Sequence, residues 1–299
     1  MEIYQQISAN RFKTVLIMVL FVVFVTTVVY VFSKALGYGL PLVGLALIFA
    51  GVTSFGSYFY SDKLVLATVG AKQIQKNDNP ELFRIVENLS IGDGVPIPKI
   101  YVMNDQSANA FATGRDPNHA VLCVTSGILG VLNKVELEGV IAHELSHVKN
   151  YDTRLMGIVA ILVGFIAIAA NFFMRSLWFG GNRRDSNESG NLQLIFLVIG
   201  IVFAILSPIV ATLIQLSVSR KREYLADASG ALLTRYPEGL ASALEKISAS
   251  KIPLKSASNA NAHLFIINPF TGKDVKAWFS SLFDTHPPVE ERIRILRSM

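Results

Sequence analysis

Long apolar stretches without any charged residue alternate with mixed polar segments along this chain of 299 residues. Four stretches reach the roughly 17–25 residues needed to cross the hydrocarbon core of a bilayer. They cover residues 14–32, 40–60, 155–174 and 192–218. The short connection 33–39 and the polar loop 175–191 predict that they form two transmembrane hairpins. Because the first stretch exceeds the roughly 7–15 apolar residues of a signal peptide, we interpret it as an uncleaved anchor.

The remaining segments show the shorter patterns of a folded polar domain. Three apolar runs bounded by turn residues predict a small antiparallel sheet, and a further strand is predicted before them; the four runs are residues 99–103, 109–113, 120–125 and 63–69. Helical spacing with capping signals predicts helices at residues 79–89, 220–233, 237–248 and 289–297. We therefore expect an α+β membrane protein: a mainly helical domain with a small antiparallel sheet, plus four transmembrane helices.

Composition supports a membrane protein. Hydrophobic residues make up 52% of the chain and charged residues 16%, against about 25% charged in a typical soluble domain. The net charge of +5 is attributed to basic residues flanking the spans, and no nucleic-acid partner is expected. The single cysteine, Cys123, excludes an intrachain disulfide and is predicted to be a buried strand residue.

The distribution of Lys and Arg near the span ends predicts the orientation in the membrane. Most of these residues flank the segments that contain the two termini and residues 143–147; they are Arg11, Lys13, Lys63, Arg154, Arg220, Lys221 and Arg222. They place these segments on the cytoplasmic side. The opposing observation is a second basic group in the loop 175–191, namely Arg175, Arg183 and Arg184.

The candidate chemistry lies in the sequence His143-Glu144-Leu145-Ser146-His147. The preceding residues have helical spacing and no proline, and positions i and i+4 share one helix face, so both imidazoles can bind one metal ion. Glu144 is the predicted general base for the attacking water. A solvated helix with two ordinary histidines is the alternative, but the pattern arises by chance in roughly one such chain in a hundred.

Two imidazoles leave a catalytic zinc ion one protein ligand short. Glu223 and Asp227 lie four residues apart on one predicted helix, so one can bind the metal while the other orients a ligand histidine. Alternatively, Glu223 forms an ion pair with Arg220 or Arg222. Asp152 is the next candidate for the third ligand, and its alternative is a salt bridge to Arg154 or Lys149.

Four motifs, in chain order, resemble those of the HtpX-type membrane zinc endopeptidases, gluzincins related to the CAAX prenyl-protease. They are residues 107–114, 143–147, 219–227 and 285–293, so the resemblance covers the whole chain. It implies a zincin-like catalytic domain with one zinc ion held by His143, His147 and Glu223, and Asp227 as the partner that orients a ligand. It also implies a multi-pass protein of the bacterial plasma membrane that cleaves membrane or misfolded proteins on the cytoplasmic side, in quality control and stress response.

Two further groups of residues are expected to serve the substrate. The edge of the predicted sheet could bind an extended peptide by strand addition through Asn109, Ala110 and Phe111; alternatively, the strands only support the helix. The resemblance places His286 and Arg292 near the active site. There His286 would donate a hydrogen bond to the carbonyl oxygen in the transition state, unless it merely caps the last helix.

Arg292 would bind a substrate carboxylate or orient the surroundings of the His286 imidazole. The apolar residues of the segment 251–284 are expected to dip into the membrane surface or to cover the site. His119, at a turn, is expected to be solvated and not a ligand.

The chain is thus expected to consist of four parts: residues 1–60 with the first hairpin, 61–154 with the first part of the catalytic domain, 155–218 with the second hairpin, and 219–299 with the rest of the domain. A transporter is disfavoured because the spans carry no ionisable residue. An inactive zinc-binding scaffold would not need Glu144. An intramembrane protease is disfavoured because no apolar window of roughly 18 residues contains the motif. The oligomeric state stays open.

Overall fold

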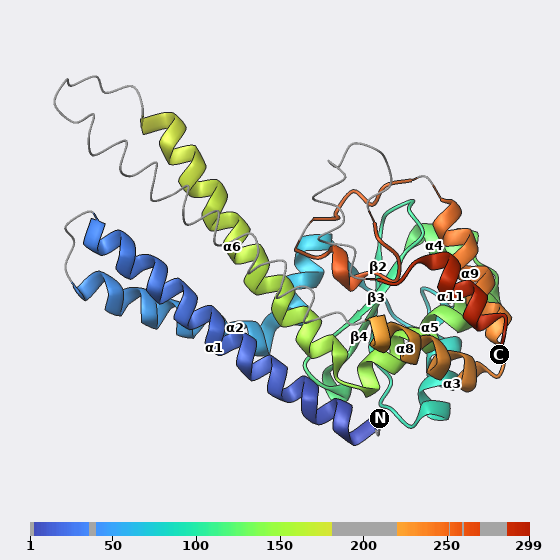
Figure 1. The fold of residues 1–299 in the computed structure, drawn as a ribbon. Helices are drawn as coiled ribbons and strands as arrows, with labels where there is room; N and C mark the ends of the chain where they lie inside the picture. The colour runs from blue at the N-terminus through green and yellow to red at the C-terminus, as the bar shows by residue number, and fades with distance from the viewer. Residues whose placement is uncertain (1–2, 36–39, 181–219, 251, 259, 270–285) are drawn as a thin grey trace.

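The computed structural model describes residues 3–35, 40–180, 220–250, 252–258, 260–269 and 286–299. Three long helices extend from a more compact domain: α1 (Ile3–Ala35), α2 (Leu40–Val69) and α6 (Asp152–Gly180) (Figure 1). The first turns of α1 lie beside the domain, and the helix then runs away from it. The fourth predicted span, residues 192–218, lies outside the described residues.

Two of the described helices are long and apolar enough to cross a membrane, over Ser8–Thr27 in α1 and Val43–Val69 in α2. Their outer faces expose large apolar side chains, among them Phe12, Ile48 and Phe55. Their inner faces pack on the start of α6, where Ile17, Phe21, Leu155 and Leu162 are buried together. The exposed apolar outer faces of α1 and α2 favour contact with lipid, because a large apolar surface is unfavourable in water.

The prediction of a strand at residues 63–69 was wrong, because these residues form the last turns of α2. Val65, Leu66 and Val69 are buried and pack against the domain. Their spacing also fits one face of a helix, so a short apolar run did not distinguish the two conformations.

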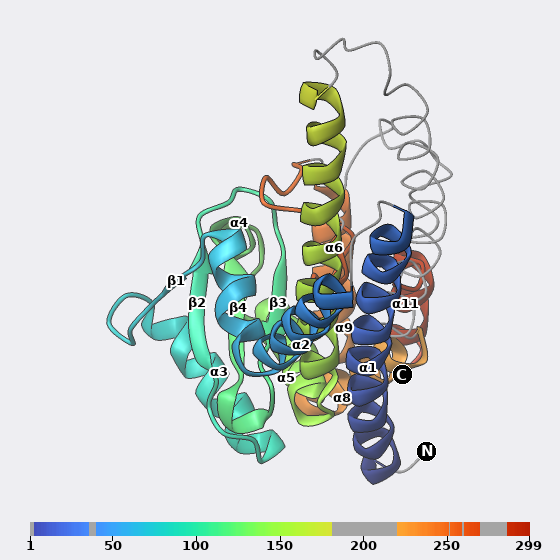
Figure 2. The ribbon, with the colours of Figure 1, turned by 90° about the vertical axis from the view of Figure 1, so that its left-hand side faces the viewer.

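The sheet has four strands in the order β1-β2-β4-β3 (Figure 2). Their bounds are Lys72–Gln73, Lys99–Met103, Ala110–Thr113 and Val121–Thr125 for β1 to β4. The sheet is mixed and not wholly antiparallel as predicted: the pairs β1–β2 and β3–β4 are antiparallel, but β2 and β4 are parallel. The chain leaves β2, forms β3 at the edge and returns between them as β4, and this connection is long enough to allow a parallel pair.

Helices cover the sheet and complete the core. They are α3 (Pro80–Asp93), α4 (Ser126–Val131), α5 (Lys134–Lys149), α8 (Arg220–Thr234), α9 (Pro237–Ala249) and α11 (Val289–Leu296), with short 3-10 turns at Pro117–His119 and Ala262–Leu264. The predicted start of α3 is confirmed, because the Asn79 side chain accepts a hydrogen bond from Leu82 N at 3.0 Å. The core between sheet, α5 and α9 contains Leu122, Val140, Ile141 and Leu244.

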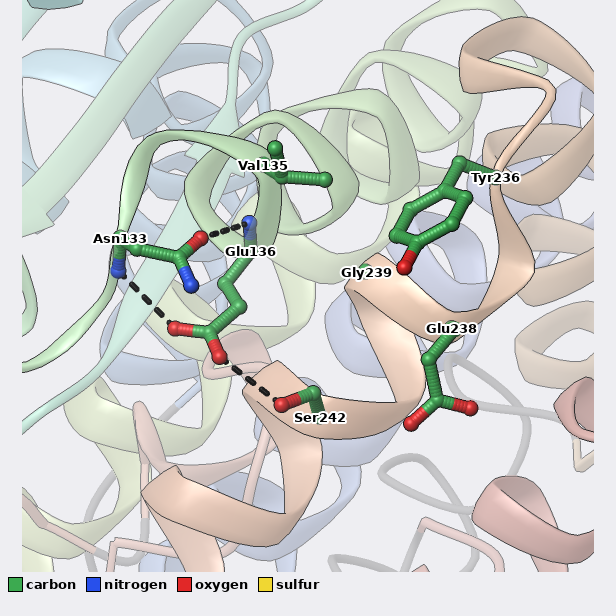
Figure 3. Close-up of a pocket in the computed structure, with 7 residues that line it drawn as sticks. All are labelled: Asn133, Val135, Glu136, Tyr236, Glu238, Gly239 and Ser242. Carbon is green, nitrogen blue, oxygen red and sulfur yellow. Dashed lines mark hydrogen bonds between the residues drawn. The ribbon is translucent and has the colours of Figure 1, made fainter.

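The start of α5 is fixed by reciprocal hydrogen bonds between Asn133 and Glu136 (Figure 3). Asn133 Oδ1 accepts from Glu136 N at 3.0 Å, and Glu136 Oε2 accepts from Asn133 N at 2.9 Å. Ser242 and Lys246 of α9 donate to the same buried carboxylate, each at 2.8 Å. A Cβ at Gly139 would lie 2.7 Å from the Leu240 nitrogen, so glycine allows α5 and α9 to touch. These contacts hold the helix that carries the candidate chemistry.

Candidate active site

The histidines of α5 lie side by side, as the helical spacing predicts. His143, Glu144 and His147 are all buried. The Nε2 atoms of the two histidines are 3.2 Å apart. Two ligand atoms held tetrahedrally at about 2.0–2.1 Å from one zinc ion lie about 3.3–3.4 Å apart. The two imidazoles therefore have the spacing that a shared metal ion needs.

Helix α8 brings a third donor to this pair. Glu223 Oε1 lies 3.5 Å from His147 Nε2, and Glu223 Oε2 lies 3.9 Å from His143 Nε2. One ligand atom from each of these three residues lies within 4.8 Å of the others. Close packing of the helices makes this possible, since a Cβ at Gly230 would lie 3.0 Å from the His143 nitrogen. Two imidazole nitrogens and one carboxylate oxygen form the donor set of many catalytic zinc sites.

A carboxylate faces the second ring nitrogen of each histidine. His143 Nδ1 lies 3.0 Å from Asp227 Oδ1, and His147 Nδ1 lies 3.0 Å from Asp152 Oδ2. These contacts leave both Nε2 atoms turned toward Glu223. Asp152, the other candidate for the third ligand, thus contacts the far side of the His147 ring and not the group of three donors.

The charged groups around the His143 and His147 imidazoles favour positive charge at this position. Burial lowers the pKa of His147, but the hydrogen bond that its Nδ1 donates to Asp152 and the charge of Glu223 outweigh this effect and raise the pKa to about 9. Burial raises the pKa of Asp227, and the guanidinium of Arg292 outweighs this effect, so the pKa falls to about 2. Ionised carboxylates thus surround the histidines, and this environment suits a divalent metal ion.

Glu144 points from α5 to the edge strand of the sheet. Its Oε2 accepts a hydrogen bond from the backbone nitrogen of Ala112 in β3 at 2.8 Å. Burial raises the pKa of this carboxyl, and the charge of Glu223 adds to the effect, while both histidines oppose it. A carboxylate with a raised pKa is better suited to accept a proton near neutral pH.

His286 and Arg292 lie against the same group of acids. His286 Nδ1 is 3.0 Å from Glu223 Oε2, and its Nε2 is buried without a hydrogen-bond partner in the described part of the chain. Helix α11 begins at Val289 without a side-chain cap, so His286 does not cap it. Arg292 is fully buried and donates to Asp227 and to the Ile266 carbonyl oxygen.

Strand β3, expected to bind substrate, has partners within the chain. Asn109 Nδ2 donates to Ile267 O at 3.1 Å, and Ala110 O accepts from Ile266 N at 3.0 Å. The ring of Phe111 packs edge-on against Phe265 at 5.2 Å between centroids. Residues 265–267 therefore cover β3. Residues 270–285 lie outside the described part of the chain.

Sequence reasoning missed two contacts of Asp152 next to the site. Asn10 and Arg222 both donate to Asp152, at 2.8 and 2.9 Å. Asn10 is 142 positions from Asp152, and its only signal is a polar residue just before an apolar stretch. His119 is exposed and contacts Asp116 and Arg115, as expected for a solvated residue outside the site.

The site and the membrane helices define a membrane metalloprotease of the His-Glu-x-x-His type, and comparison with known proteins agrees. Residues 76–299 match the model of peptidase family M48. The chain therefore belongs to peptidase family M48 and is a hydrolase that cleaves polypeptides.

Curated relatives cover the whole chain. It is 45% identical over 296 residues to the "Protease HtpX homolog" of Dictyoglomus thermophilum, across 99% of this chain and 94% of the relative. It is 46% identical over 306 residues to the "Protease HtpX homolog" of Lactobacillus helveticus, across 99% and 100%. The predicted resemblance to HtpX-type proteases is thus confirmed. The crystal structure of S. mikatae Ste24p aligns with a TM-score of 0.48 at 19% identity, over 90% of this chain and 61% of that one.

Proposed function

We propose that this protein is a zinc endopeptidase that cleaves membrane or misfolded proteins at the membrane surface. The observation that carries the proposal is the convergence of His143, His147 and Glu223 on one point, within 4.8 Å of one another. These three residues would hold one zinc ion per chain. When bound, zinc polarises the substrate carbonyl and makes water a stronger nucleophile. All other tasks fall to side chains of the protein.

Glu144 moves the proton. It takes a proton from the attacking water at its carboxylate and later delivers it to the nitrogen of the leaving amine. Its raised pKa supports this role, and the hydrogen bond from Ala112 N holds the carboxylate beside β3.

Two acids hold the ligand histidines in the required orientation and tautomer. Asp227 faces His143 and Asp152 faces His147, each at 3.0 Å from Nδ1. Carboxylates in this position fix the ring and increase its basicity as a ligand. Arg292 in turn fixes Asp227. We assign it this orienting role over binding of a substrate carboxylate, because its donors already contact Asp227 and Ile266.

His286 stabilises negative charge on the substrate. Its Nδ1 contacts Glu223, and we assign its Nε2 to donate a hydrogen bond to the oxygen of the attacked carbonyl. The contact at 3.0 Å and the unpartnered Nε2 support this assignment. A donor aimed at such an oxygen contributes about 2.7–4 kcal/mol to catalysis.

An extended substrate would pair with the edge strand β3 through Asn109, Ala110 and Phe111. In the described conformation residues 265–267 contact this strand, so substrate would replace them. The proximity of Glu144 to the backbone of Ala112 supports this path, because it puts the proposed base next to the strand that would hold the substrate.

The protein would be a multi-pass protein of a bacterial plasma membrane, with four spans and the four-part organisation predicted above. Cationic side chains stack on aromatic rings where the helices meet the domain, which is typical of a membrane interface; the pairs are Arg11 with Tyr151, Lys63 with Tyr60, Arg115 with Phe59, and Arg154 with Tyr58 and Tyr151. These contacts support a junction near a membrane surface, and the basic span ends favour the cytoplasmic face for the catalytic domain.

The variant Glu144→Gln tests the proposal. Purified in detergent, it should bind zinc like the wild type and lose roughly 10²–10⁴ in the rate of casein-type proteolysis, since it lacks only the base. His143→Ala should lose zinc as well. Undiminished turnover by Glu144→Gln would contradict the proposed mechanism, whatever the zinc content of the variant.

A further inference from the structure

The first membrane helix reaches the surroundings of the metal site through Asn10. This residue lies on α1, in the second turn of the helix and within the candidate span Ser8–Thr27. Its side chain is 2% exposed. Asn10 Nδ2 donates to Asp152 Oδ1 at 2.8 Å and to the Asn150 carbonyl oxygen at 2.9 Å. An asparagine amide is thus fully engaged on the catalytic domain.

Asp152 links this amide to a metal ligand. Its other oxygen, Oδ2, lies 3.0 Å from His147 Nδ1. Arg222 Nη1 donates to Asp152 Oδ1 at 2.9 Å and to Asn10 Oδ1 at 3.1 Å. The amide of Asn10 therefore donates to the carboxylate and accepts from the cation of the same buried cluster.

These hydrogen bonds determine how the carboxylate faces the imidazole. A buried carboxylate that lacks donors on one oxygen has lost its hydration there without compensation, so it turns or recruits water. With Asn10 and Arg222 on Oδ1, Oδ2 stays directed at His147. Residues that orient a metal-binding histidine change metal affinity or activity by roughly 10–100-fold.

We propose that Asn10 is a positioning residue of the active site, acting on His147 through Asp152. This inference rests on the proposed role of His147 as a zinc ligand. The first membrane helix then does more than anchor the enzyme, since it supplies part of the structure that holds the metal ligand. The alternative is that Asn10 only attaches α1 to the domain.

The variant Asn10→Leu separates these two roles. Leucine has a similar size and is more apolar and more helix-forming than asparagine, so the span should form and insert at least as well. The matched control is Thr14→Val, one turn further along α1. Thr14 is equally buried, at 2% exposure, but within the described part of the chain its hydroxyl donates only to the carbonyl oxygen of Asn10 in the same helix.

The full-length variants are compared in detergent by zinc affinity in a chelator competition and by the visible spectrum of the cobalt-substituted protein. Asn10→Leu should weaken zinc binding roughly 10-fold and alter the cobalt spectrum, while Thr14→Val leaves both unchanged. Wild-type affinity and spectrum in Asn10→Leu would overturn the proposal, and so would equal losses in both variants.

A second variant serves if Asn10→Leu does not fold. Asn10→Asp keeps the shape of the side chain and replaces the donor with an acceptor, so it should weaken zinc binding at least as much. Wild-type zinc affinity in Asn10→Asp would again overturn the proposal.

Two more variants identify the path of the effect. In an Asp152→Asn background, Asn10→Leu should add little further loss of zinc affinity, because the two act through one carboxylate. A full additional 10-fold loss would contradict the path through Asp152. His147→Ala tests the premise separately: if it retains zinc at wild-type affinity, the proposed ligand set fails, not the role of Asn10 alone.

Discussion

Arg292 and Asp227 form a bidentate ion pair that is buried from solvent. Arg292 Nε lies 2.8 Å from Asp227 Oδ2, and Nη2 lies 2.7 Å from Oδ1. Asp227 Oδ1 also lies 3.0 Å from His143 Nδ1. The last helix, α11, is thereby connected to a proposed metal ligand on α5 through a single carboxylate on α8.

This ion pair predicts a large loss of stability when the Arg292 guanidinium is removed. Arg292→Leu should lower the free energy of unfolding by about 3–5 kcal/mol, because it leaves the buried charge of Asp227 without its partner. Arg292→Lys should recover only part of this loss, since lysine cannot form the two parallel hydrogen bonds. Denaturant unfolding of the purified protein measures both. The control is Arg294→Leu on the same helix, because the Arg294 side chain is exposed. An equal loss of unfolding free energy in Arg294→Leu would contradict a special role for the buried ion pair.

Glu223 and Asp227 should respond differently to substitution. Glu223→Ala removes a proposed ligand atom. Asp227→Ala removes no proposed ligand atom, but it removes the carboxylate that faces His143 and pairs with Arg292, and it should change affinity or activity roughly 10–100-fold. Zinc affinity by chelator competition should therefore fall much further for Glu223→Ala. If Glu223→Ala holds zinc as tightly as the wild type, another residue completes the donor set.

What the sequence predicts correctly depends on how local the interactions are. The i, i+4 histidines and the Asn79 cap are set within one helix, and both are found where the spacing predicts them. The helix at 63–69 was missed because its apolar residues satisfy strand and helix patterns alike. The parallel pairing of β2 with β4 depends on where β3 folds, which no pattern within the strands determines.

The same distinction applies to the site. The pair His143 and Glu144 follows from one motif, but the approach of Glu223 depends on packing of α8 against α5 at Gly230. The resemblance supplied that link, because spacing alone left an ion pair with Arg220 or Arg222 open. Asn10 carries no motif, and its contact with Asp152 exists only in the folded chain.

Thiol labelling tests the orientation in the membrane. A cysteine placed at Asn187, in the loop between the later predicted spans, should react with an impermeant reagent in intact cells, while one at Lys221 should not. Cys123 should give no background, because it is fully buried and burial raises the pKa of its thiol to about 12. The wild type with Cys123 alone is the control. The opposite pattern would reverse the proposed cytoplasmic location of the catalytic domain.

His286 should affect the chemical step more than metal binding. Its Nδ1 contacts Glu223 at 3.0 Å and its Nε2 has no protein partner among the described residues. His286→Ala should therefore lower kcat by about 10²–10³, the effect of removing one donor to the oxygen that becomes negative. Zinc content and KM should change little, because the interaction forms mainly in the transition state.

The contact with Glu223 offers a second explanation, which the same measurements separate. If His286 only supports the ligand, His286→Ala should lose zinc affinity, and kcat should return to the wild-type value once zinc is saturating. A variant with a lower melting temperature and wild-type kcat would instead show that the imidazole is purely structural. His119→Ala provides the control, because His119 is exposed and contacts only its neighbours Arg115 and Asp116 among the described residues. It should match the wild type in zinc affinity and in both kinetic constants, so that a selective loss of kcat in His286→Ala assigns the donor to this residue.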